Sequence, residues 1–173
     1  MKKFVFDPAF RRTFLAFVER VCSEKANLQA LNCLRDKYHL NENVLLFACW
    51  MGGQNYRCLN QHDFRFILKK IAPWHQKIVQ GLQLLLQSVK EQGHRQRIKE
   101  LRTILFEVET FASRLELLSI FQLTRHLEAQ PQQKKNAMNR AMTNVFSYVH
   151  SQQISIHQND LEKIYRFVSS SFS

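Results

Sequence analysis

Residues 34–50, LRDKYHLNENVLLFACW, are a polar turn that runs directly into an apolar block. Across residues 44–51 no side chain is charged, and the only polar groups are a thiol and an indole. A helix that is apolar on every side must be buried on every side. We therefore expect this block to be the central helix around which the rest of the protein packs. The residues predicted to form the core are Val44, Leu45, Leu46, Phe47 and Trp50, together with Trp74 further along the chain.

The overall composition favours helices over strands. The chain has 173 residues with 4 glycines and 3 prolines, and it is rich in leucine, glutamine, lysine and arginine. We predict an all-α fold: a compact multi-helix bundle around the buried central helix, with a long antiparallel helical hairpin. Residues 1–130 are expected to form an all-helical core domain. Residues 131–173, which follow a linker at 130–133, are expected to form a helical pair that packs on the core or on a partner.

Capping residues predict several helix boundaries. Asn41 or Asn43 is suited to cap the central helix, and Gly52-Gly53 is suited to end it. Asn60 is the expected cap of the next helix. Pro73 is expected to begin a further helix, because proline is favoured in the first helical turn.

Two apolar patterns in the middle of the chain predict the hairpin, with Gly93 at its tip. The second pattern has the 3-4-3-4-3 spacing of a heptad seam, whose expected partner is the preceding helix, although a separate dimer seam is an alternative. The first pattern comprises Trp74, Ile78, Leu82, Leu85 and Val89, and the second comprises Ile98, Leu101, Leu105, Val108, Ala112 and Leu115.

Residues 33–39, CLRDKYH, and 43–50, NVLLFACW, resemble an uncharacterised family of short proteobacterial proteins of unknown function. That family carries a D-V-N-L-L-L-F-x-x-W-like block and a later tryptophan, which Trp74 matches. The resemblance extends over about residues 10–120 and implies the fold and a bacterial origin, but no mechanism. The chain departs from the family pattern at Arg35, where the family has Gln, at Asn41-Glu42-Asn43, where it has Asp-Val-Asn, and at Gly81-Leu82-Gln83, where it has Pro-Leu-Arg.

The net charge of +11 is the strongest global signal, and it is concentrated in residues 57–102, which hold 10 basic and 3 acidic groups. Such a segment favours an acidic partner, either a protein surface or a nucleic acid. An aromatic residue beside the basic ones, Phe66, could stack on a base. The candidate basic surface comprises Arg65, Lys69, Lys70, Lys90, Arg95, Arg97, Lys99 and Arg102.

No motif predicts catalysis, a metal site or a cofactor. The four cysteines form no CxxC pair, no HExxH is present, and Cys58 near His62 lacks a third orienting group. Glu107 and Glu109 point to different sides of a helix, and Glu116 is expected on a solvated face. The N-terminus has no signal-peptide pattern, and no apolar run is long enough to span a bilayer. We therefore expect a bacterial cytoplasmic protein that is not an enzyme, has no cofactor and has no integral membrane association.

Two functions from different classes fit this sequence. In the first, the protein is a protein-interaction or adaptor module whose residues 131–173 dock on a partner or on a second copy of the chain. The Met138 and Met142 side chains favour this, because methionine repacks easily against varied surfaces. In the second, the basic hairpin binds nucleic acid or the ribosome through phosphates.

Overall fold

The computed structural model describes residues 8–54, 58–91, 96–123 and 136–172, and within them all regular structure is helical. The all-α prediction is therefore confirmed. The elements are α1 (Pro8–Ser23), α2 (Lys25–Tyr38), α3 (Glu42–Gly53), α4 (Gln61–Trp74), the π-helix η1 (His75–Val79), α5 (Gln80–Glu91), α6 (Gln96–Leu123), α7 (Ala137–Ser151) and α8 (Gln158–Ser170). None of these helices is both long and apolar enough to cross a membrane.

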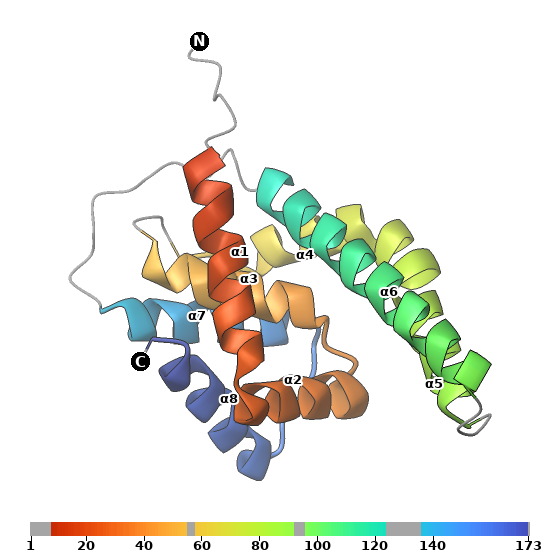
Figure 1. The fold of residues 1–173 in the computed structure, drawn as a ribbon. Helices are drawn as coiled ribbons and strands as arrows, with labels where there is room; N and C mark the ends of the chain where they lie inside the picture. The colour runs from red at the N-terminus through yellow and green to blue at the C-terminus, as the bar shows by residue number, and fades with distance from the viewer. Residues whose placement is uncertain (1–7, 55–57, 92–95, 124–135, 173) are drawn as a thin grey trace.

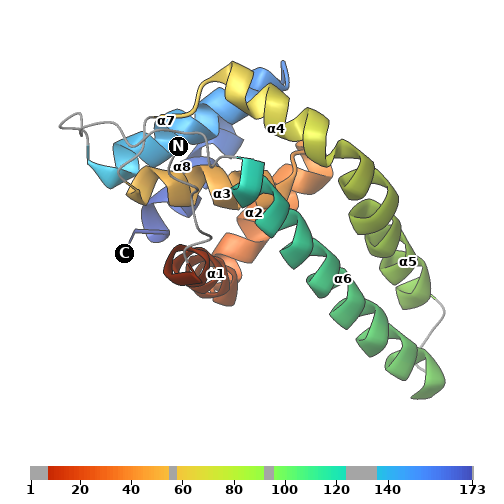
Figure 2. The ribbon, with the colours of Figure 1, turned by 90° about the horizontal axis from the view of Figure 1, so that it is seen from above.

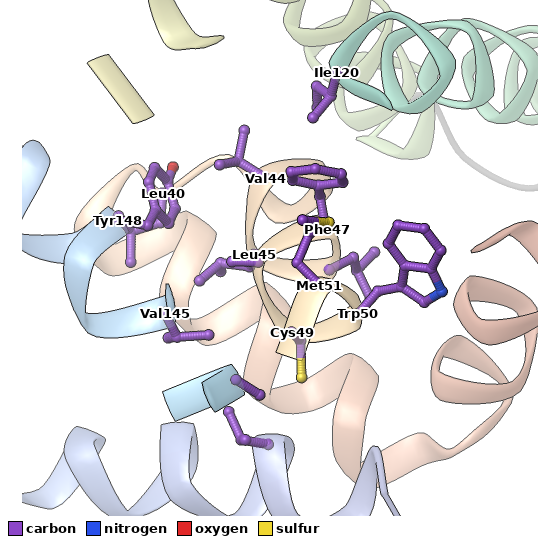
Figure 3. Close-up of a cluster of buried hydrophobic side chains, with 14 of the residues drawn as sticks. Leu40, Val44, Leu45, Phe47, Cys49, Trp50, Met51, Ile120, Val145 and Tyr148 are labelled. Atoms are coloured by element: carbon purple, nitrogen blue, oxygen red, sulfur yellow. The ribbon is translucent and has the colours of Figure 1, made fainter. Parts of the chain in front are cut away.

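Helix α3 is the centre of the molecule, as its sequence predicts. All residues from Asn43 to Gly52 are buried, including the predicted core residues Val44, Leu45, Leu46, Phe47 and Trp50. Helices α1, α2, α7 and α8 surround α3 (Figure 1). In Figure 3, Val145 and Tyr148 of α7 approach α3 from one side and Ile120 of α6 from another.

Two of the predicted caps are present. The side chain of Asn41 accepts a hydrogen bond from the backbone N–H of Val44 at 3.1 Å, so Asn41 is the residue that caps α3. Asn60 forms a capping box with Asp63 at the start of α4, in which each side chain accepts from the other's backbone N–H. Both caps satisfy backbone donors that a helix start leaves without intrahelical partners.

The C-terminal helices pack on the core of their own chain. Helix α7 lies so close to α3 that a Cβ atom added to Gly52 would stand 2.4 Å from the backbone nitrogen of Ala141. Buried side chains of α7 and α8 belong to the same hydrophobic cluster as those of α1 to α4, and Met138 and Met142 are partly buried against it. The two parts of the chain on either side of residue 130 therefore share one core.

An ionic cluster fixes α8 to α2. The carboxylate of Asp160 accepts hydrogen bonds from Lys163 at 2.6 Å, Lys37 at 2.5 Å and the Tyr38 hydroxyl at 2.7 Å. These three donors favour the charged form and lower the pKa of Asp160 well below its usual range.

Pro73 does not begin a helix, which corrects the prediction from its position in the sequence. It lies inside α4, and α4, η1 and α5 form one continuous rod. A proline within a helix has no N–H to donate to the carbonyl four residues earlier, and its ring crowds that carbonyl. A widened turn follows Pro73 in the rod, in which the N–H of Gln80 reaches back to the carbonyl of His75.

Helices α5 and α6 form the predicted antiparallel hairpin, and it projects from the helices around α3 as an arm (Figures 1 and 2). We call η1, α5 and α6 the arm. The expected tip residue, Gly93, lies outside the described residues. Within α6, the buried side chains lie in the C-terminal part, from Ala112 to Phe121.

Trp74 is not a core residue, contrary to the prediction. It lies where the rod leaves the rest of the molecule, and 39% of its surface is exposed. Its indole N–H donates to the carbonyl of Ala112 at 3.1 Å, so the ring lies across the two helices of the arm. Tryptophan is often placed in this way, because it has one apolar face and one polar atom that needs a partner.

Candidate binding surface on the arm

Helix α6 carries apolar side chains on two sides. The predicted heptad seam divides between them: Ala112 is buried and Ile98 and Leu105 are half-buried, whereas Leu101 and Val108 are exposed. The exposed pair continues a second stripe with Ile104 and Phe111, at the 3-4-3 spacing of one helix side. Helix α6 therefore has a seam for α5 and a second apolar stripe beside it.

The rod that contains α5 contributes a matching stripe. Trp74, Ile78 and Leu85 are each between 38% and 47% exposed, and they recur at helical spacing. In an antiparallel pair, this sector of α5 and the exposed sector of α6 lie on the same side of the hairpin. Trp74 also links the two helices, since its indole N–H donates to the carbonyl of Ala112 in α6. We call these residues the apolar arm face: Trp74, Ile78, Leu85, Leu101, Ile104, Val108 and Phe111.

The candidate basic residues lie in two patches. Lys90, Arg97 and Lys99 are exposed and Arg102 is half-buried, and all four are in the distal half of the arm. Arg65, Lys69 and Lys70 are exposed on α4, at the other end of the rod (Figure 2). The predicted stacking residue Phe66 is exposed beside Lys70, whose Nζ lies 5.7 Å from the ring centroid. Arg95 lies outside the described residues.

A buried polar cluster anchors the arm. Glu116 of α6 is 0% exposed, which corrects the prediction of a solvated position. Its carboxylate accepts hydrogen bonds from the side-chain amides of Asn41 at 2.8 Å and Asn43 at 3.0 Å. Nδ1 of His75 lies 3.0 Å from its other oxygen. A buried carboxylate needs such partners, since it would otherwise cost several kcal/mol.

Sequence reasoning missed this cluster, although a signal existed. Glu116 follows Ala112 and precedes Ile120 by four residues, so it lies on the buried side of α6. Asn41 and Asn43 were recognised only as possible caps. His75 belongs to no motif in the sequence, yet only 18% of its side chain is exposed.

A small cavity of about 50 Å³ adjoins the cluster. Within it, Arg35 pairs with Glu42 at 3.1 Å. Burial raises the pKa of Glu42 above its usual range, and Arg35 partly opposes that effect. The cavity is large enough to hold ordered water between these polar side chains. The residues that line it include Arg35, Glu42, Asn43, His75, Gln80 and Gln83.

Neither the buried Cys49 nor the half-buried Cys22 is an activated nucleophile. Burial raises the pKa of the Cys49 thiol to about 12 and that of Cys22 to about 11. A thiol reacts as its thiolate, so these two side chains behave as small apolar groups at neutral pH.

Comparison with known proteins adds one finding. The family described as "Protein of unknown function (DUF2390)" matches residues 16–120. The chain belongs to this family. The DUF2390 match begins in α1 and ends in α6 at Ile120, so it includes α3, the anchoring cluster and the arm face, while α7 and α8 follow it. The resemblance seen in the sequence is thereby confirmed. No curated protein matches the chain, and no solved structure does.

Proposed function

We propose that this DUF2390 protein is a non-enzymatic protein-binding module of the bacterial cytoplasm, and that the apolar arm face is its binding surface. The observation that carries the proposal is the exposure of Phe111, Ile104 and their neighbours on a projecting hairpin. Phe111 alone is 63% exposed. Contiguous apolar patches on folded proteins are typical of sites that another macromolecule covers.

The sequence suggested residues 131–173 as the docking segment. The packing of α7 and α8 on the core supports the arm as the binding surface instead. The buried side chains of α7 and α8 are part of the core and are not available to a partner. The arm differs, because its own two helices leave the residues of the apolar arm face exposed. Its attachment through the Glu116 cluster would hold the face in one orientation, which lowers the entropy lost on binding.

Affinity purification of the tagged protein from its native cell, with nuclease present, tests the proposal. Ile104→Glu should lose captured proteins because it puts a charge in the middle of the face. Leu84→Glu is the matched control: Leu84 is 65% exposed on the same arm but lies on a different side of α5. Equal capture by both variants would contradict the proposal.

The second candidate function is nucleic-acid binding by the distal half of the arm. What favours it is the gathering of Lys90, Arg97, Lys99 and Arg102 there, against only Glu91 and Glu100 among the described residues. Phosphate binding through four such groups would weaken by orders of magnitude over a few-fold rise in salt. Apolar docking would hardly change. Charge reversal at Lys99 and Arg102 should abolish binding to RNA or DNA while leaving helicity intact.

A further inference from the structure

We propose that the partner of the apolar arm face is the same face of a second copy of this chain, with the two arms packed antiparallel as a four-helix bundle. This rests on the proposed function, since it names the partner of that surface. Three observations support it: the spacing of the face residues, the area they leave uncovered and the distribution of charge along α6.

The spacing is that of a coiled-coil helix with two partners. Leu101, Ile104, Val108 and Phe111 repeat at 3-4-3, while Ile98, Leu105 and Ala112 repeat at intervals of seven on the side toward α5. Helices of four-helix bundles show this double pattern, because each packs against two neighbours. The arm supplies two of the four helices, and a second arm would supply the other two.

The uncovered area is of the size that a stable dimer needs. A large apolar side chain has roughly 200 Å² of surface. With exposed fractions from 38% to 63%, the face residues together leave on the order of 600 Å² uncovered. A typical specific interface buries about 800 Å² on each partner, including its polar rim. The arm face is therefore large enough to be the apolar centre of such an interface.

Charge sets the direction of packing. Residues 96–102 hold Arg97, Lys99 and Arg102 against Glu100, a net charge of +2. Residues 103–115 hold Glu107 and Glu109 against Arg114, a net charge of −1. Glu116, the next acidic residue, is buried in the anchoring cluster and is not counted. Antiparallel arms bring the positive half of one α6 onto the negative half of the other, whereas parallel arms would place like charges together.

A two-fold axis near the middle of α6 gives a definite register. Leu101 of one copy then meets Phe111 of the other, and Ile104 meets Val108, so the contact is isologous. Beside this seam, Glu100 comes opposite Arg114, an exposed residue that pairs only at the surface with Glu19. The two Glu107 side chains meet at the axis, and their repulsion would weaken the dimer.

The oligomeric state of the full chain tests the proposal, measured by light scattering coupled to size exclusion from low to high micromolar concentration. The wild-type chain of 20.6 kDa should run as a concentration-dependent dimer. Ile104→Glu should raise the dissociation constant at least 100-fold with unchanged circular dichroism, while Leu84→Glu should leave it unchanged. Glu107→Gln should lower it several-fold. A wild type that stays monomeric throughout, or equal effects of the two charged variants, would overturn the proposal.

The register has its own test. Chains with Leu101→Cys are mixed with chains with Phe111→Cys and oxidised; the mixture should crosslink, and each variant alone should crosslink no more than wild type. Crosslinking of Leu101→Cys to itself would indicate parallel arms and overturn the antiparallel arrangement. If the wild type is monomeric but Ile104→Glu still loses a captured protein, the dimer proposal is wrong and the proposed protein-binding function stands. If the wild type is monomeric and Ile104→Glu captures the same proteins as the wild type, both the dimer and the proposed function are wrong.

Discussion

Helices α3 and α6 both carry apolar side chains on more than one side, yet only α3 is covered by its own chain. Ten consecutive residues of α3 are buried, from Asn43 to Gly52. In α6 the buried residues begin at Ala112, and the exposed apolar residues lie before it. An apolar pattern therefore shows that a surface needs a neighbour, but not which molecule supplies it.

The largest expected contrast between the two helices is in their phenylalanines. Phe47→Ala in α3 should lower the free energy of unfolding by about 3–5 kcal/mol, since it leaves a cavity in a close-packed core. Phe111→Ala in α6 should change it by less than about 0.5 kcal/mol at low protein concentration. Urea unfolding of both variants measures the difference. Similar losses would mean that α6 is more covered than its exposure shows.

A change in the anchoring cluster should lower the free energy of unfolding by an amount between those expected for the two phenylalanine variants. Glu116→Leu should cost about 3 kcal/mol, because it leaves the amides of Asn41 and Asn43 without their acceptor in a buried site. Glu116→Gln keeps an acceptor oxygen and should cost less. Unfolding curves give the energies, and hydrogen exchange in α6 should speed up in the leucine variant. If Glu116→Leu left the free energy of unfolding unchanged, the cluster would contribute nothing to holding the arm.

A smaller, pH-dependent effect is expected where α8 meets α2. The lowered pKa of Asp160 means that the folded state binds fewer protons than the unfolded state. Its stabilisation is complete above the ordinary carboxyl pKa of about 4 and is lost as pH falls below that value. Asp160→Asn should therefore melt at a lower temperature at pH 7, and the difference should shrink below pH 4. Glu162→Gln, on the exposed side of α8, is the control and should show neither effect.

The smallest expected effect is an increase in the free energy of unfolding. His39, between α2 and α3, has a φ of 54°, in the left-handed region. Glycine adopts this conformation without the steric cost that a side chain incurs. His39→Gly should raise the free energy of unfolding by about 0.5–1 kcal/mol. A thermal melt measures this, and a loss of stability would show that the histidine side chain makes a contact that matters.

Much of the fold follows from local patterns, because burial on all sides and capping are local properties. The unbroken apolar run from Val44 to Phe47 requires burial, and Asn41 and Asn60 are of a residue type that caps helices, as they do in α3 and α4. Pro73 was misread because its preference for a first helical turn is local, whereas α4 continues through this proline into η1 and α5. Trp74 was misread because a large apolar side chain favours a core position, whereas this one lies where the rod leaves the rest of the molecule, with its indole N–H on the carbonyl of Ala112.

The candidate site was less predictable, because it depends on which helices meet. Glu116 finds its partners on α3 and η1, far away in the sequence, and no spacing rule relates them. The seam on α6 was recognised as apolar, but whether Leu101 and Val108 face α5 or solvent depends on how the two helices rotate against each other. The rotation of each helix about its own axis is set by packing between the helices, so the periodicity of a single helix does not predict it.

The close approach of Gly52 to Ala141 has a consequence for how the protein is made. Helix α3 is synthesised early, but the helix that lies on Gly52 ends only at Ser151. Until Ser151 has left the ribosome, one side of the most apolar segment of the chain is open to solvent. Packing of the core therefore cannot be completed before Ser151 has been synthesised, and the most apolar helix has to wait for a partner that lies about a hundred residues further along the chain.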